Sequence, residues 1–156
     1  MKARLTLLFV AIASFSLIGL AVYLQVVKFM LACPLCIIQR YCFIAIGLFA
    51  LVGAIGSAVK PASILGLLAA LGGGGVAARL MYVQAHPTIS CGIDPVETML
   101  NKVFTAEWFP TLFQANGECT TPYPPFLGLS VPQGAMLWFV IFAVIFVVLL
   151  VRRRED

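Results

Sequence analysis

Charged residues are scarce in this sequence. Only 10% of its 156 residues are Asp, Glu, Lys or Arg, and 62% are hydrophobic. Soluble domains carry charge on about a quarter of their residues, so this composition excludes an ordinary soluble protein and indicates that lipid is the main solvent. The formal net charge of +4 does not indicate binding to nucleic acid, because the basic residues stand at the ends of apolar runs instead of clustering on a soluble face.

Long apolar runs take the place of the missing charges. A helix that crosses a bilayer needs about 20 apolar residues. The runs predict four spans within a single membrane domain, 1–156, at about 5–27, 37–59, 61–83 and 131–151. The first run is too long for the apolar core of a secretory signal and no convincing cleavage site follows it, so we expect a retained helix. The predicted fold class is an all-α membrane protein with a four-helix bundle.

Most of the basic residues fall on one side of the predicted membrane. They are Lys2, Arg4, Lys60, Arg152, Arg153 and Arg154. Because loops rich in Lys and Arg stay in the cytoplasm, we expect both termini to be cytoplasmic. The outer loops, at about 28–36 and 84–130, are then extracytoplasmic, and the second of them is mostly acidic.

The second outer loop contains one segment with a helical pattern. Seven of the nine prolines lie between Pro87 and Pro132, so most of the loop is expected to be irregular. Asp94 suits an N-cap and Pro95 suits the first helical position. The apolar residues that follow at helical spacing are Val96, Met99, Leu100, Val103 and Phe104. The pattern predicts a short amphipathic helix that lies on the membrane surface or packs on the outer rim of the protein.

Four consecutive glycines, Gly72 to Gly75, lie inside the third predicted span. Each costs about 1 kcal/mol relative to alanine in an exposed soluble helix, so the run indicates close approach by another helix or by a ligand. We favour helix packing over a groove for a lipid-like cofactor.

Four of the five cysteines are predicted to lie outside the membrane, where disulfides persist: Cys33, Cys36, Cys91 and Cys119. Cys33 and Cys36 form a Cys-x-x-Cys pair where the second span begins. The positive end of a helix dipole favours the thiolate, which is the nucleophile in disulfide exchange. The pair therefore predicts a redox site. Cys42 lies inside the span and is expected to be a small buried apolar residue.

Three other interpretations of the cysteines compete with a redox site. Haem attachment requires a histidine directly after the pair, and Ile37 stands there. A zinc site usually has two closely spaced ligand pairs, whereas Cys91 and Cys119 are far apart in sequence, so no metal is expected. Inert structural disulfides are plausible for Cys91 with Cys119 and less so for the first pair. Four cysteines allow three pairings, which stay open on these grounds.

Arg40 is a charged residue inside the second span. It follows Cys36 by four residues, about one helical turn, and so shares its face. A guanidinium there can stabilise a thiolate and the negative charge of a reduced acceptor, although an arginine that reaches out to head groups is the alternative. For Arg79, an arginine that reaches out to lipid head groups is the better interpretation. His86, the only histidine, is a candidate acceptor ligand or a surface residue.

The sequence resembles the disulfide bond formation protein B (DsbB) family over essentially its whole length. The matching segments are Cys33-Pro34-Leu35-Cys36 with Arg40, Cys91, Trp108-Phe109-Pro110, Ala115-Asn116-Gly117-Glu118-Cys119, Phe126-Leu127-Gly128-Leu129 and Pro132-Gln133. Cys42 and the glycine run are not part of this pattern.

The resemblance implies a thiol:quinone oxidoreductase of the bacterial inner membrane that reoxidises a periplasmic DsbA-like protein with a thioredoxin fold. Cys91 would form the mixed disulfide with that partner, and Cys119 would exchange with Cys33. Cys36 would face ubiquinone or menaquinone beside Arg40, with His86 as a weaker candidate for quinone binding. We take this as the predicted function.

Other functions have weaker support in the sequence. A reductase that carries electrons outward needs thiols reachable from the cytoplasm, and no cysteine lies near Lys60 or the termini. A transporter should have ionisable residues along a path through the bilayer, whereas Arg40 and Arg79 both lie near one side. A structural four-span protein with disulfide-stapled loops leaves Arg40 unexplained.

Overall fold

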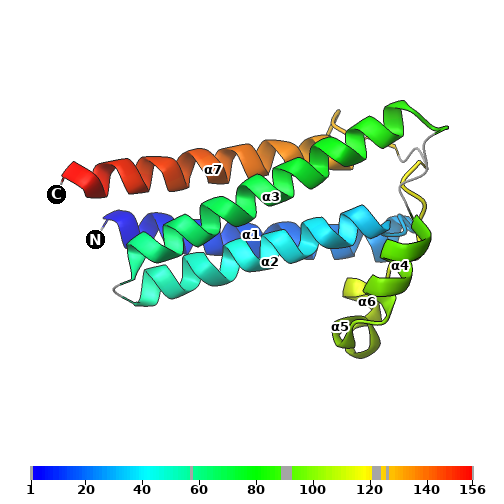
Figure 1. The fold of residues 1–156 in the computed structure, drawn as a ribbon, viewed down its shortest axis with the longest axis horizontal. Helices are drawn as coiled ribbons and strands as arrows, with labels where there is room; N and C mark the ends of the chain where they lie inside the picture. The colour runs from blue at the N-terminus through cyan, green and yellow to red at the C-terminus, as the bar shows by residue number, and fades with distance from the viewer. Residues whose placement is uncertain (1, 57, 89–92, 121–123, 126, 156) are drawn as a thin grey trace.

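Four long helices form the body of the protein. The computed structural model describes residues 2–56, 58–88, 93–120, 124–125 and 127–155. The long helices are α1 (Lys2–Lys28), α2 (Pro34–Ile55), α3 (Val59–Ala85) and α7 (Val131–Glu155). They run side by side with both termini at the same end (Figure 1). All four are long and apolar enough to cross a membrane, which confirms the predicted all-α fold with four spans.

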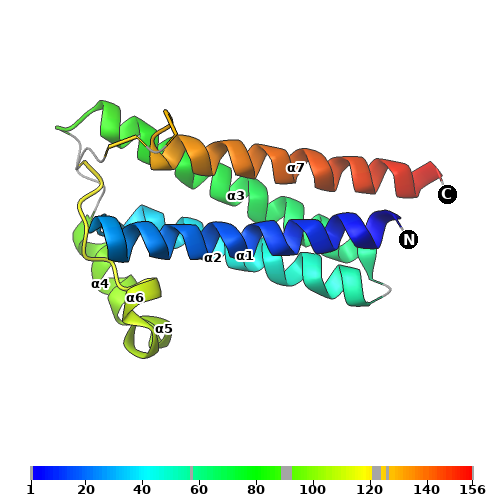
Figure 2. The same cartoon turned by 180° about the vertical axis from the view of Figure 1, so that it is seen from behind.

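The helices pack in the order α1, α2, α3 and α7, each against the next. The core contains Phe139, Phe142 and Phe146 of α7, which are at most 1% exposed. The Phe139 ring stacks on Phe43 of α2 with a centroid distance of 4.2 Å. Among the described residues, α1 and α7 share no extensive interface. Figure 2 shows α1 and α7 on the same side of the bundle, with α3 behind them.

The helix bounds differ from those expected from hydropathy. The second span was expected at 37–59, but α2 starts at Pro34 and ends at Ile55, and Val59 belongs to α3. Gly56 follows α2 as its C-cap residue. The apolar run continues through the turn between α2 and α3, so hydropathy alone does not detect this turn, whereas Gly56 is a helix-ending signal.

Three short helices lie at the end of the bundle that is remote from the termini: α4 (Ile93–Asn101), α5 (Phe104–Trp108) and α6 (Pro110–Phe113). The helix expected after Asp94 is present as α4. It starts at Ile93, so Asp94 and Pro95 lie inside its first turn, and the expected capping positions were wrong by two residues. The helix also ends before Val103, which is the N-cap residue of α5.

The short helices pack on the outer end of α2. Ala106, Phe113 and Ala115 are buried against Ala32 and Ile37. The Tyr41 ring of α2 stacks on Phe113 at 4.8 Å, and its hydroxyl forms a hydrogen bond with Thr105. The structure thus shows packing on the rim of the bundle. The large apolar side chains that remain exposed on these helices and between them are Met99, Val103, Phe104, Trp108 and Phe109, and contact of this surface with the membrane stays a prediction.

The glycine run packs against α7 at one position. A Cβ atom added to Gly73 would overlap the Phe139 ring, whereas a Cβ on Gly72 or Gly75 would meet nothing within 4 Å. Close helix packing therefore explains Gly73, in agreement with the favoured interpretation, and does not explain Gly72 or Gly75.

We expect Gly73→Ala to destabilise the bundle by about 1–3 kcal/mol, because the added methyl must displace a buried ring that also stacks on Phe43. Gly72→Ala is the matched control and should leave stability unchanged or raise it by up to about 1 kcal/mol. Unfolding of the purified variants in detergent measures both. Equal stabilities would contradict the packing of α3 on α7.

Candidate functional site

Cys33 and Cys36 lie at the amino-terminal end of α2. Cys33 is the N-cap residue, and its sulfur accepts a hydrogen bond from the Cys36 backbone N–H at 3.3 Å. Pro34 follows in the first helical turn, where its missing N–H costs nothing. The Cys33 thiol also donates to the Cys36 sulfur across 2.8 Å, and neither cysteine is in a disulfide. The pair is thus a dithiol held together by one helix end.

The two sulfurs have different roles in the hydrogen bond that joins them. The hydrogen bond to Cys36 raises the pKa of the Cys33 thiol above its ordinary value, and burial of Cys33 raises it further. Cys33 therefore keeps its proton at neutral pH and Cys36 is the acceptor. This asymmetry makes Cys36 the better nucleophile of the pair.

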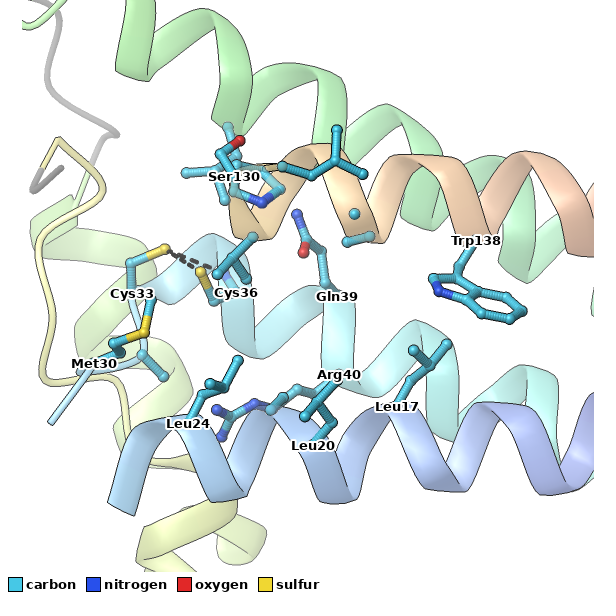
Figure 3. A pocket seen from close by; sticks show the side chains of 18 of the residues that line it. Leu17, Leu20, Leu24, Met30, Cys33, Cys36, Gln39, Arg40, Ser130 and Trp138 are labelled. Atoms are coloured by element: carbon cyan, nitrogen blue, oxygen red, sulfur yellow. Dashed lines mark hydrogen bonds between the residues drawn. The ribbon is translucent and has the colours of Figure 1, made fainter. Parts of the chain in front are cut away.

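A cavity of about 310 Å³ lies beside this pair. Its polar lining includes Cys33, Cys36, Gln39, Arg40 and Cys119. The apolar walls come mainly from α1 and α7 and include Leu17, Leu20, Leu24, Leu137 and Trp138. Figure 3 shows the two cysteines at one end of the labelled side chains and Trp138 at the other. The cavity therefore has a polar, thiol-bearing end and an apolar end.

Arg40 is buried, with 6% of its surface exposed. One terminal nitrogen of its guanidinium donates to the Leu112 carbonyl at 2.7 Å and to the Thr111 carbonyl at 3.5 Å. The other donates to Gln25 Oε1 of α1 at 2.7 Å. The guanidinium thus bonds to protein atoms and does not extend to the surface. It joins α2 to α1 and to α6 while also lining the cavity with Cys36.

Cys119 is disulfide-bonded and only 1% exposed. It packs in one buried cluster with Cys33, Leu80 and Val83. The structure therefore places side by side the two cysteines that were expected to exchange. Cys91, which was also expected at the site, lies outside the described residues.

Two backbone hydrogen bonds fix the chain just before Cys119. The Asn116 and Gly117 N–H groups both donate to the Ala32 carbonyl, at 3.1 and 3.0 Å. A Cβ on Gly117 would collide with the Leu31 carbonyl, so only glycine allows this approach. Because Ala32 directly precedes Cys33, this pairing holds Cys119 at the first cysteine pair.

Asn101 at the end of α4 supports the same segment. Its Oδ1 accepts from the Ala115 N–H at 2.9 Å, and its Nδ2 donates to the Ala115 carbonyl at 3.2 Å. Sequence reasoning missed Asn101, as well as Gln25 and Gln39. Both glutamines are uncharged polar residues within apolar helices, and Gln39 directly precedes Arg40 in the sequence. These features could have marked them as candidates.

His86 is not among the residues that line the cavity. It is exposed and follows α3, with its Nδ1 3.1 Å from the Tyr82 carbonyl and its ring 4.5 Å from the Tyr82 ring. Gln84, two residues earlier, does line the cavity. Arg79 is exposed. Within the described part of the chain, no group of three or more His, Cys, Asp or Glu side chains is arranged to hold a metal ion.

Comparisons with known proteins agree on one family. The model of the family described as disulfide bond formation protein DsbB matches residues 3–149. Disulfide bond formation protein B of Herminiimonas arsenicoxydans is 51% identical over 144 residues, which cover 91% of each chain. The protein of the same name from Ralstonia nicotianae is 43% identical over 155 residues, which cover 99% of this chain and 98% of the relative.

The Asn101 hydrogen bonds predict a measurable effect on disulfide formation. With Cys36 and Cys91 replaced by serine, Cys33 and Cys119 are left side by side and should form a disulfide rapidly with diamide. Adding Asn101→Ala should slow this reaction about 5- to 20-fold, because loss of about 1–2 kcal/mol of hydrogen bonding depopulates the docked segment. Gel mobility after thiol alkylation follows the reaction.

Asn116→Ala is the matched control, since only the backbone of Asn116 enters the described hydrogen bonds. It should keep the parent rate. Equal rates in the Asn101 and Asn116 variants would show that the Asn101 side chain does not position Cys119.

Proposed function

The chain belongs to the DsbB family of membrane disulfide oxidoreductases, and we propose that it passes electrons from a periplasmic dithiol protein to a membrane quinone. The dithiol protein is a DsbA-like oxidase with a thioredoxin fold, and the quinone is ubiquinone or menaquinone. One observation carries the proposal: a single cavity is lined by Cys33, Cys36, Cys119 and the buried Arg40, and most of its other lining residues are apolar.

The cavity fits an amphipathic acceptor of this kind. Ligand sites are mostly apolar with a few placed polar groups, and a quinone has a polar ring and an apolar tail. Cys36 and Arg40 provide the polar end, while Leu17, Leu20 and Trp138 provide part of the apolar walls. A bound quinone supplies an acceptor for two electrons and two protons.

The thiol steps follow from the reactivity of the cysteines. A thiolate of the partner attacks the disulfide that contains Cys119, for which Cys91 is the proposed second half. The resulting Cys119 thiolate attacks a Cys33–Cys36 disulfide at Cys33, and Cys36 leaves as the thiolate. The partner's second thiol then displaces Cys91 from the mixed disulfide, and Cys91 attacks Cys119, which releases Cys33. Each exchange breaks one S–S bond and forms one, so the loop disulfide re-forms and the two electrons and two protons of the partner dithiol reside on Cys33 and Cys36. Arg40 stabilises the negative charge beside Cys36.

The proposed location is the bacterial inner membrane, with the cysteine end in the periplasm. The termini, which carry most of the basic residues, lie at the opposite end of the bundle from α4–α6 (Figure 1). Among the described residues, Arg40 is the only buried charged side chain, and it lies at the cysteine end. A transporter with charged groups along its path therefore has no support in this part of the chain.

Steady-state quinone reduction by the purified protein tests the function. With a reduced DsbA-like protein as donor, the parent should reduce quinone, and Cys119→Ser should lower the rate at least 100-fold because the loop disulfide is lost. Quinone should still oxidise Cys33 and Cys36 in that variant. Cys42→Ser is the control and should keep the parent rate, since Cys42 is not among the residues that line the cavity. A parent rate in Cys119→Ser would exclude the relay.

Arg40 gives a second test of the quinone step. Arg40→Ala should raise the KM for quinone about 10- to 150-fold, which corresponds to about 1.5–3 kcal/mol for a charged hydrogen bond. Arg40→Lys should recover only part of this, because one ammonium does not reproduce the fork that bonds both Leu112 and Gln25. A parent KM for quinone in Arg40→Ala would remove Arg40 from the acceptor site.

A further inference from the structure

Gln39 is a buried residue of the cavity wall whose amide N–H group has no hydrogen-bond partner in the described chain. It lies on α2 between Cys36 and Phe43, three residues after the first and four before the second, and all three line the cavity. Its side chain is only 5% exposed. Figure 3 shows it projecting from α2 into the space beside Cys36, on the side of Ser130 and α7.

The Nε2 atom of Gln39 has no hydrogen-bond partner in the described chain. A buried amide donor without a partner costs about 1–3 kcal/mol, and none of the other polar residues that line the cavity accepts a hydrogen bond from this atom. Among the described residues, two other buried side-chain atoms lack a partner, the hydroxyl oxygens of Ser14 and Ser63, and neither residue lines the cavity. Gln39 is therefore the unpaired buried donor that a ligand in the cavity can reach.

The guanidinium of Arg40 already has hydrogen-bond partners within the protein. Three of its hydrogen bonds go to Thr111, Leu112 and Gln25, so its guanidinium is turned toward α6 and α1. Figure 3 shows Arg40 and Gln39 pointing in different directions from α2. A ligand beside Cys36 can therefore meet the Gln39 amide on the α7 side, while Arg40 lines the same cavity from the α1 side.

We propose that Gln39 binds the acceptor directly, with its Nε2–H donating a hydrogen bond to a carbonyl oxygen of the quinone ring beside Cys36. This inference rests on the proposed quinone-reducing function. It gives the site a neutral, directional contact in addition to the charge of Arg40. Such a contact orients the ring against the Cys36 sulfur, because a hydrogen bond to one carbonyl weakens steeply as the angle departs from linear.

Gln39→Met tests this contact. Methionine has nearly the shape of glutamine and no amide, so it removes the donor and keeps the packing. The full-length protein is placed in lipid nanodiscs and titrated with a short-chain benzoquinone. Trp138 lines the cavity and reports binding through its fluorescence, and a Trp108→Phe background leaves it as the only tryptophan.

We expect the variant to bind the benzoquinone about 3- to 10-fold more weakly, the effect of one neutral hydrogen bond. The KM for quinone should rise by the same factor, and the KM for the protein donor should not change. The ligand-free melting temperature should stay equal or rise, because an unpaired buried amide has been removed. Ser63→Ala removes another unpaired buried group away from the cavity and should leave quinone affinity unchanged.

The outcomes separate the inference from the function it rests on. If the parent binds and reduces quinone while Gln39→Met shows the parent affinity, Gln39 does not contact the acceptor. A lower ligand-free melting temperature with an unchanged quinone KM would assign Gln39 a structural role and also overturn the inference. A parent protein that neither binds nor reduces quinone would overturn the proposed function itself.

Discussion

The buried charge of Arg40 constrains the whole outer end of the molecule. A guanidinium within a membrane helix is stable only when its donors find acceptors, and here these are carbonyls of α6 and the amide of Gln25. Satisfying the charge therefore requires α6 to lie against α2 and α1. That position in turn brings the chain after α6 across Ala32, where Asn116 and Gly117 form their hydrogen bonds. The charge that lines the cavity beside Cys36 thus also fixes the loop that carries Cys119.

The two cysteine positions depend on local backbone geometry more than on side-chain attraction. Cys33 caps α2, and Ala32 just before it offers the carbonyl that holds the segment leading to Cys119. The close approach at Gly117 leaves no room for a side chain, which gives a physical reason for glycine in this segment. Cys33 and Cys119 are buried in one cluster, and this proximity would favour the proposed exchange between them.

Hydropathy and spacing predicted the four spans, the helix-capping Cys-x-x-Cys pair and the common face of Cys36 and Arg40, because each depends on a local period. The turn at Gly56 was misplaced because both flanking helices are apolar. The roles of Asn101, Gln25 and Gln39 could not be predicted, since they depend on where α4–α6 settle on the bundle. His86 turns toward Tyr82, while Gln84 lines the cavity. Local sequence could not show this, because it depends on which face of the last turn of α3 points toward the cavity.

The proposed function requires a site that serves two substrates from different phases. In that proposal the dithiol protein comes from water and the quinone from lipid, so a pocket open to one phase alone would not admit both. The cavity has apolar walls from α1 and α7, two helices that do not pack closely on each other, and its thiol end lies under the outer loop. In the proposed relay, electrons pass between Cys119 and Cys33, which lie in one buried cluster. The proposal therefore needs only a short thiol relay at the cysteine end, and the rest of the bundle can remain an apolar scaffold.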